Sequence, residues 1–342
     1  MALPEKPCSR GGRPLFLWPR ARWRKVMNML PASGSFSGHE SFPFRYTWLT
    51  KGVRYCASDP TIFTKPEAMA LLGVGKNMVR SIRHWCLACG VIEEDLTQPN
   101  NRGRWLRPTE LGRSIFGDDD HPWDPYLEDV GTLWLLHWQV TTDSARATTW
   151  HFAFSHIHDL EFTRPGLELA LLEFARRIPN VRASRGTIKR DIEVFVRTYA
   201  PSRRQDDVAI EDSLDCPLAE LGLILPMEDA SCYRFNRGSQ KTLPDLVFAY
   251  AVGQYFRRRL GVKTVSLEEL AYASDSPGRV FKLDEYSLGE RLERIHKVTD
   301  GAWHFSETAG LKQLVAAKQP NEMGFLARHY GRSRTAKRGG AA

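Results

Sequence analysis

Thr64-Lys-Pro-Glu-Ala-Met-Ala-Leu-Leu-Gly-Val-Gly-Lys-Asn-Met-Val-Arg-Ser-Ile-Arg-His-Trp-Cys-Leu-Ala-Cys-Gly90 contains two helical patterns on either side of a glycine turn. In the first pattern Thr64 can cap a short helix, and Pro66 falls in the first turn, where its missing N–H is tolerated. The turn Gly73-Val-Gly75 leads into a longer helix of about residues 76–89, in which apolar side chains recur every three or four residues. The segment therefore predicts a helix-turn-helix.

The polar face of the longer helix is basic, because Lys76, Arg80 and Arg83 lie at i, i+4 and i+7. Two strand-like segments, 91–93 and 104–107, follow and predict a hairpin, after which Thr109 can cap a short helix. This order predicts a winged helix over residues 35–117. Side chains of these types can bind phosphates and the acceptor edges of guanine or adenine. The predicted DNA-binding residues are Lys76, Asn77, Arg80, Arg83, His84, Arg102 and Arg104.

Helical patterns continue through the middle of the chain, over residues 126–138, 148–157, 165–177, 184–199 and 243–259. Ser184 can cap the helix that ends at Tyr199, and this helix also has a basic polar face. The strand-like segments 221–225 and 233–235 follow it. Residues 118–262 are therefore predicted to be a helical middle region, within which a second winged helix is left open.

The C-terminal part shows a similar order of elements. Ser266-Leu-Glu-Glu269 is a capping box, a helix is predicted over 287–295, and Trp303-His-Phe305 is predicted to be a strand before a helix over 307–317. We predict a winged-helix-like unit over residues 263–317. Its helices mix acidic and basic residues, which favours an interaction or structural module. The predicted fold class is mainly α, with winged helix-turn-helix units joined by a helical middle region.

The net charge of +8 comes from the two ends of the chain. Residues 1–34 hold seven Lys and Arg against one Glu, and residues 318–342 hold six against one Glu. We expect a disordered basic leader over 1–34 and a disordered basic tail over 318–342, which would attract polyanions nonspecifically. Because Met27 and Met29 follow the Arg-rich stretch, we expect the true start codon to lie downstream of Met1.

Composition limits the function classes. With 42% hydrophobic residues in 342, the chain can bury more than one core, and no segment approaches the ~20 apolar residues of a membrane span. The six cysteines and the lack of a secretory signal predict reduced thiols in the cytoplasm. The sequence has no Walker loop, no Gly-x-Gly-x-x-Gly and no Gly-x-Ser-x-Gly, which argues against an ATPase, a dinucleotide enzyme and an α/β-hydrolase.

Gly38-His-Glu-Ser-Phe-Pro-Phe-Arg45 and the helix-turn-helix residues 72–85 resemble the bacterial domain-of-unknown-function family 4007. Further similar segments are Thr149-Trp150, Lys189-Arg-Asp-Ile192 with Thr198-Tyr199, and Tyr233-Arg-Phe235, so the resemblance covers roughly residues 35–317. It implies a DNA phosphorothioation locus, double-stranded DNA as a partner, and other proteins of a modification or defence complex. The family is associated with the component of Ssp-type systems credited with DNA nicking, but it supplies no catalytic residues for this chain.

Three motifs could carry metal chemistry. His39 and Glu40 are neighbours in sequence and point in different directions, so His39, Glu40 and Arg45 are interpreted as a motif with a local structural or phosphate-binding role. Cys86-Leu-Ala-Cys89 has the spacing of half a zinc site, but both thiols fall on the apolar helix face and no second pair follows, which favours buried free cysteines. No metal site is predicted there.

Residues 151–161 form the densest run of possible metal ligands, with His156, His158 and Asp159 as weak catalytic candidates. Neither a strand nor a helix gathers three of these ligands without help from elsewhere. If the protein nicks DNA, they would have to bind a divalent ion such as Mg²⁺ or Mn²⁺.

The sequence therefore predicts a cytoplasmic DNA-binding component of a bacterial phosphorothioate modification or defence system. The alternatives are a metal-dependent DNA nickase of that system and a nonenzymatic adaptor or transcriptional regulator. Whether the protein is an enzyme is left open.

Overall fold

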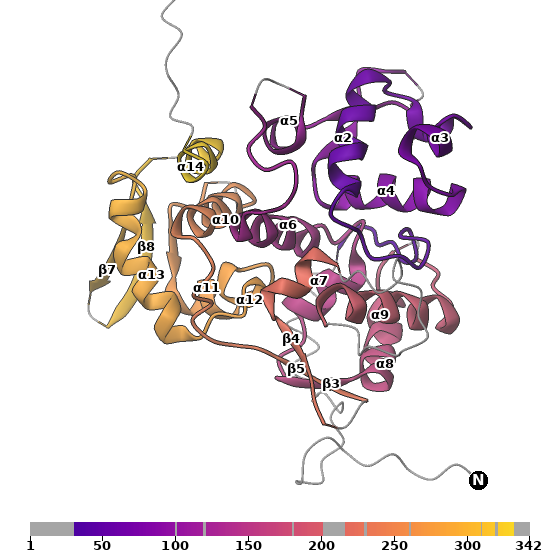
Figure 1. Ribbon diagram of the computed structural model, residues 1–342. Helices are drawn as coiled ribbons and strands as arrows, with labels where there is room; N and C mark the ends of the chain where they lie inside the picture. Colours follow the sequence, from indigo (N-terminus) through magenta and orange to yellow (C-terminus); the bar gives the residue numbers. More distant parts are fainter. Residues whose placement is uncertain are drawn as a thin grey trace, which may run out of the picture. The chain divides into compact units, whose positions relative to one another are not determined.

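The computed structural model describes residues 31–99, 101–118, 121–179, 181–200, 216–228, 231–259, 261–308, 310–318 and 321–331 (Figure 1). Helices make up most of the regular structure, so the predicted mainly α class is confirmed. The chain divides into two compact units, of which the first ends at Arg237 and the second begins at Gly238. Most of the predicted leader and the tail beyond residue 331 lie outside the described residues. In the described parts, no helix is long and apolar enough to cross a bilayer.

The first unit opens with a group of short helices and a hairpin. Its elements are α2 (Trp48–Ser58), η1 (Ile62–Thr64), α3 (Ala68–Leu72), α4 (Lys76–Ala88), β1 (Ile92–Glu94), β2 (Leu106–Pro108) and α5 (Glu110–Phe116). The two strands are antiparallel, with Ile92 opposite Pro108. As predicted, the Thr109 hydroxyl caps α5 by accepting from the Gly112 N–H at 3.0 Å.

The prediction that Thr64 caps a helix is wrong. Thr64 is the last residue of η1, where its hydroxyl donates to the carbonyl oxygen of Thr61, and the N-cap position of α3 is held by Glu67, which makes no side-chain cap bond. Helix α3 begins only at Ala68 and has five residues. Gly73 ends it with a φ of +66°, a left-handed conformation that glycine adopts without steric cost.

The rest of the first unit packs helices on a small sheet. Its elements are α6 (Val130–Thr142), α7 (Thr148–Ser155), β3 (Glu161–Thr163), α8 (Arg164–Ala175), α9 (Arg185–Tyr199), η3 (Pro217–Leu221), β4 (Ile224–Pro226) and β5 (Cys232–Phe235). The Ser184 hydroxyl caps α9 as predicted, accepting from the Thr187 N–H at 3.1 Å. Helices α6 and α7 are buried on nearly all sides, and their aromatic side chains form the core with those of α9: Trp134, Trp138, Trp150, Phe154 and Phe195.

The second unit contains α10 (Asp245–Arg257), β6 (Thr264–Ser266), α11 (Leu267–Tyr272), α12 (Pro277–Val280), α13 (Glu285–Val298), β7 (Trp303–Thr308), β8 (Leu311–Ala316) and α14 (Glu322–His329). The prediction of a helix over 307–317 is wrong, because β8 pairs with β7 along its whole length, from Trp303 opposite Ala316 to Thr308 opposite Leu311. Gly310, with a φ of +79°, lies in the turn between the strands. Helix α14 lies in the segment expected to be a disordered tail, and it buries Phe325 and Leu326.

The two three-stranded sheets share one topology. In each, a helix precedes the first strand, and further helices separate that strand from the hairpin: α8, α9 and η3 in the first unit, and α11, α12 and α13 in the second. The strand orders are β3-β5-β4 and β6-β8-β7, so the last strand pairs with both others. Strand β3 was not predicted, and it makes the predicted pair of segments near 221–225 and 233–235 part of a larger sheet. The sheet of the N-terminal group has two strands, β1 and β2. Where the other two sheets pair a first strand with the last one, the Leu106 N–H of β2 donates to the carbonyl oxygen of Pro60 at 2.9 Å.

Candidate nucleic-acid interface

The N-terminal end of α4 presents an exposed basic face. The apolar side chains of the opposite face are buried in the core: Val79, Ile82, Trp85 and Cys86. Lys76, Asn77 and Arg80 are exposed, and the first turn holds no acidic residue. Gly75 at the N-cap offers no side-chain acceptor, so the first N–H groups keep the partial positive charge of a helix start. This end of α4 therefore favours an anionic ligand such as a phosphate.

Arg83 fastens the β1–β2 hairpin to α4. Its Nη2 donates to the carbonyl oxygen of Gly103 at 2.9 Å, and burial lowers the pKa of its guanidinium. The Asn101 amide donates to two carbonyl oxygens within the hairpin, which fixes the base of its loop. Arg102 and Arg104 are exposed on either side of Gly103 and form no ion pair with a described residue. The hairpin therefore holds two free arginines beside the basic end of α4.

His84 is covered by the loop that precedes α2. A Cβ atom added at Gly38 would lie 2.4 Å from His84 Nδ1, so only glycine allows this approach. Burial, together with the nearby His39, lowers the pKa of His84 to about 3. Its ring is therefore neutral at neutral pH and offers no positive charge to a phosphate, unlike Lys76 and Arg80 on the same helix.

The motif residue His39 joins α4 to α9. Its Nε2 lies 2.6 Å from Asp191 Oδ1 of α9, and the Ser37 N–H donates to the same oxygen at 2.7 Å. On the other side, the Ser81 hydroxyl of α4 donates to the carbonyl oxygen of His39 at 2.9 Å. His39 and Asp191 are each 1% exposed, so this pair lies in the interior. The loop passes between the two helices in Figure 1.

Both ring nitrogens of His39 are engaged. The Ser41 N–H donates to Nδ1 at 3.2 Å, so Nε2 carries the proton and donates to the Asp191 carboxylate. Both nitrogens of this buried ring bond to groups of the chain itself, so neither is free to contact a ligand. We therefore interpret His39 as a residue that fixes the position of α4 relative to α9.

Two further contacts bind the same loop at the surface. Arg80 Nη1 lies 3.3 Å from Glu40 Oε1, and Arg197 Nη2 donates to the carbonyl oxygen of Ser41 at 2.6 Å. Glu40 and Ser41 have φ values of +49° and +71°, which non-glycine residues seldom adopt. The third motif residue, Arg45, lies with its guanidinium carbon 5.9 Å from the Trp48 ring centroid, a cation–π contact. The motif therefore connects the two helices.

Sequence reasoning missed Asp191 as the partner of His39. The signal was an acidic residue within the apolar face of α9, between Ile188 and Ile192. A buried carboxylate requires a partner, so its position alone pointed to a donor elsewhere. Nothing in the sequence identified that donor, because 152 residues separate the two side chains.

The weak catalytic candidates are not brought together. His156 follows α7, is 2% exposed, and has its Nε2 3.3 Å from His151 Nε2. His158 and Asp159 are exposed in the segment before β3. Across the described parts of the chain, no group of three or more His, Cys, Asp or Glu side chains is placed to bind a metal ion.

Cys86 and Cys89 are fully buried and not joined in a disulfide. Burial raises the pKa of both thiols, which keeps them protonated at neutral pH. The structure places them in the core, where the sequence predicted free cysteines.

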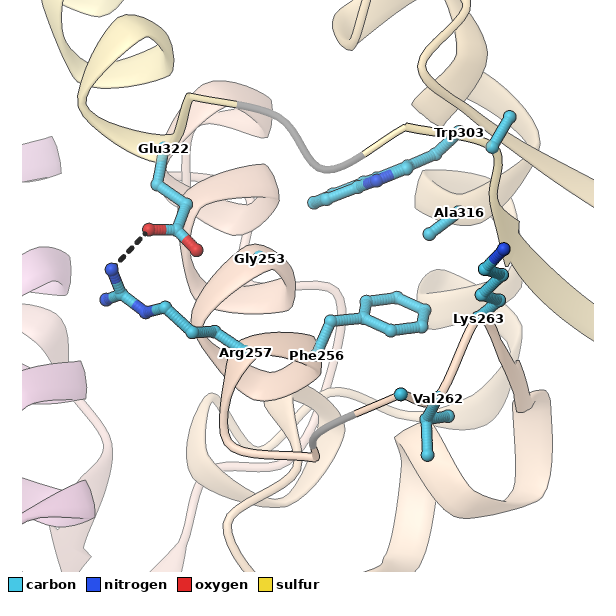
Figure 2. A pocket seen from close by; sticks show the side chains of 10 residues that line it. Gly253, Phe256, Arg257, Val262, Lys263, Trp303, Ala316 and Glu322 are labelled. Atoms are coloured by element: carbon cyan, nitrogen blue, oxygen red, sulfur yellow. Dashed lines mark ion pairs between the residues drawn. The ribbon is translucent and has the colours of Figure 1, made fainter.

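A separate pocket lies within the second unit (Figure 2). It encloses about 140 Å³ between the rings of Phe256 and Trp303, and the ion pair of Arg257 and Glu322, 2.9 Å apart, lies beside it. Burial raises the pKa of Glu322, while Arg257 opposes that shift. Pockets for small-molecule ligands usually enclose about 300 to 1,000 Å³, so this one is too small to be the main site.

The chain belongs to the family described as Protein of unknown function (DUF4007), whose model matches residues 36–330. This confirms the resemblance seen in the sequence. Among curated proteins, none matches this chain in sequence.

Two solved structures are similar over nearly the whole chain. One, an SspB crystal structure, is 30% identical, has a TM-score of 0.79, and the match covers 90% of this chain and 92% of that one. The other, a magnesium ion-bound SspB, is 29% identical with a TM-score of 0.80, over 89% of this chain and 90% of that one.

Proposed function

We propose that this protein is a DNA-binding component of a bacterial DNA phosphorothioate modification or defence system. The observation that carries the proposal is the exposed basic end of α4 next to the free arginines of the hairpin. Lys76, Arg102 and Arg104 have no ion-pair partner among the described residues. Their charges are therefore available to the phosphates of a duplex.

We interpret residues 35–117 as a winged helix in which α4 is the recognition helix. In such folds the N-terminal residues of the second helix of the helix-turn-helix contact base edges, and the wing contacts the backbone. Asn77 and Arg80 are placed for base contacts, since their side chains bind adenine and guanine edges. Arg80 can exchange Glu40 for DNA at little cost, because the pair is exposed and such pairs contribute about 1 kcal/mol or less.

The cellular setting rests on the family and on similarity to SspB. The resemblance implies phosphorothioation loci, and a role there requires a cytoplasmic protein that meets DNA and other proteins of the modification complex. A nonenzymatic adaptor or a transcriptional regulator would use the same surface, so genetic neighbourhood distinguishes these alternatives.

Metal-dependent DNA nicking is the second candidate function. It is favoured by one observation, that a similar protein, an SspB, is magnesium ion-bound. The described residues of this chain do not gather three metal-binding side chains, and His156 is buried whereas His158 and Asp159 are exposed. The described residues therefore do not form a metal site.

The test is the salt dependence of duplex binding. We expect the triple variant Lys76→Ala, Arg102→Ala, Arg104→Ala to reduce the slope of log K against log salt by about 2 to 3, since each lost phosphate contact removes about 0.9. The matched control removes three exposed lysines of the second unit: Lys241, Lys297 and Lys318. Equal slopes for the triple variant and this control would exclude α4 and the hairpin as the DNA contact.

A further inference from the structure

A second basic surface lies on α9 and on the turn that joins it to α8. Its basic residues are Arg176, Arg177, Arg182, Arg185, Lys189, Arg190 and Arg197. The acidic residues of α9 are Asp191, which is buried against His39, and Glu193. The exposed charge of this segment is therefore strongly positive.

Three of these side chains are free to bind a ligand. Arg182, Lys189 and Arg190 are exposed and form no ion pair or hydrogen bond through their side chains with a described residue. Arg185 differs, because it bonds to the nearly buried carboxylate of Glu168, and Arg177 differs because it pairs with Glu173. The free charges therefore lie on the turn and on the exposed face of α9.

Helix α9 occupies the same place in its sheet unit as α4 occupies in the N-terminal group. It follows α8 and a turn, as α4 follows α3 and a turn, and the hairpin β4–β5 follows it as β1–β2 follows α4. Strand order β3-β5-β4 is the arrangement that recurs in the second unit. By position, α9 is the recognition helix of a second helix-turn-helix.

The loop of residues 37–41 holds the two helices at one spacing. It contacts α9 through Asp191 and Arg197, and α4 through Ser81 and Arg80. Arg80 and Arg197 contact adjacent residues of this loop, which brings one basic side chain of each helix close to the same stretch of backbone. Two charged faces at a fixed spacing match a rigid ligand with regularly repeated negative charge.

We infer that α9 and its preceding turn form a second contact for the duplex bound by α4. Double-stranded DNA has one negative charge per about 1.7 Å and resists bending over this length, so it can bind both faces at once. The inference rests on the proposed function in its choice of ligand. An acidic protein bound at α9 is the competing occupant.

The experiment compares three variants of the full chain on one duplex of about 30 base pairs. The first lacks the free charges of α9 (Arg182→Ala, Lys189→Ala, Arg190→Ala), and the second is the α4 and hairpin triple variant described above. The control is the triple variant of Lys241, Lys297 and Lys318. Binding is measured by fluorescence anisotropy between about 50 and 200 mM salt. If the α9 variant does not fold, the pair Lys189→Gln and Arg190→Gln replaces it.

We expect the α9 variant to lower the salt slope by about 2 to 3 and the control to leave it unchanged. On a duplex of about 10 base pairs, which is one helical turn and too short for both helices, the α9 variant should lose less. A slope equal to the control, with a reduced slope for the α4 variant, would overturn this inference and retain the proposed function. The reverse pattern would retain the α9 contact and exclude α4.

Discussion

Replacing Asp191 with alanine should destabilise the first unit strongly. The carboxylate accepts from His39 Nε2 at 2.6 Å and from the Ser37 N–H at 2.7 Å, and it is 1% exposed. Removing the carboxylate leaves the neutral His39 Nε2–H buried without its acceptor, which costs about 1 to 3 kcal/mol. The contact with Ser37 is only partly buried, so water can replace it and it adds less. Together the two lost hydrogen bonds should lower the free energy of unfolding by about 2 to 4 kcal/mol.

Asp191→Asn keeps the volume and one acceptor oxygen and should cost only about 1 to 2 kcal/mol, the difference between a charged and a neutral hydrogen bond. Urea unfolding followed by tryptophan fluorescence measures both, since Trp150 lies 5.6 Å from the His39 ring. The control is Asp118→Ala, whose side chain is 67% exposed beside Arg54 and should change stability by less than about 1 kcal/mol. If Asp191→Ala costs no more than this control, the buried pair does not hold the two helices together.

Three other predictions follow from the same region and from the ends of the chain. The pKa of His84 is about 3 in the folded protein against an ordinary 6.5, so on acidification the unfolded chain gains a proton that the folded chain does not. The free energy of unfolding should therefore fall as the pH drops below 6.5, by about 1 to 2 kcal/mol at pH 5 for this partly covered ring. His84→Gln should remove that loss. Gly52→Ala should lower the free energy of unfolding by about 1 to 3 kcal/mol, because the added Cβ would lie 2.3 Å from Cys86 Sγ. Gly75→Ala, which has open space around it, should leave that free energy nearly unchanged, and chemical denaturation of both variants measures the difference. Deleting residues 1–26 should leave the melting temperature unchanged and lower duplex affinity at low salt, and a large drop in melting temperature would show that the leader is part of the fold.

Local sequence signals identified the elements that carry the proposed DNA contact. The spacing of apolar residues placed α4, and the caps Thr109, Ser184 and Ser266 marked three helix starts, because a cap acts on its own first turn. The family was recognised from the residues around His39 and α4, and its model matches residues 36–330.

What the sequence did not predict depends on contacts between distant residues. Strand β8 has a local pattern that also suits a helix, and its pairing with β7 decides the outcome. Strand β3 pairs with β5 across some 70 residues, with Phe162 opposite Tyr233, so no local signal defines its partner. The same holds for His39 and Asp191, which only the assembled unit brings together.

The DNA contact as a whole is tested by one variant that lacks all six free charges of the two faces: Lys76, Arg102, Arg104, Arg182, Lys189 and Arg190. Its duplex affinity should be measured against salt beside that of the parent protein. At about 0.9 per phosphate contact, we expect the slope of log K against log salt to be smaller by about 5 than that of the parent, with an unchanged melting temperature. A folded variant with the parent's affinity and slope would show that these faces do not bind DNA.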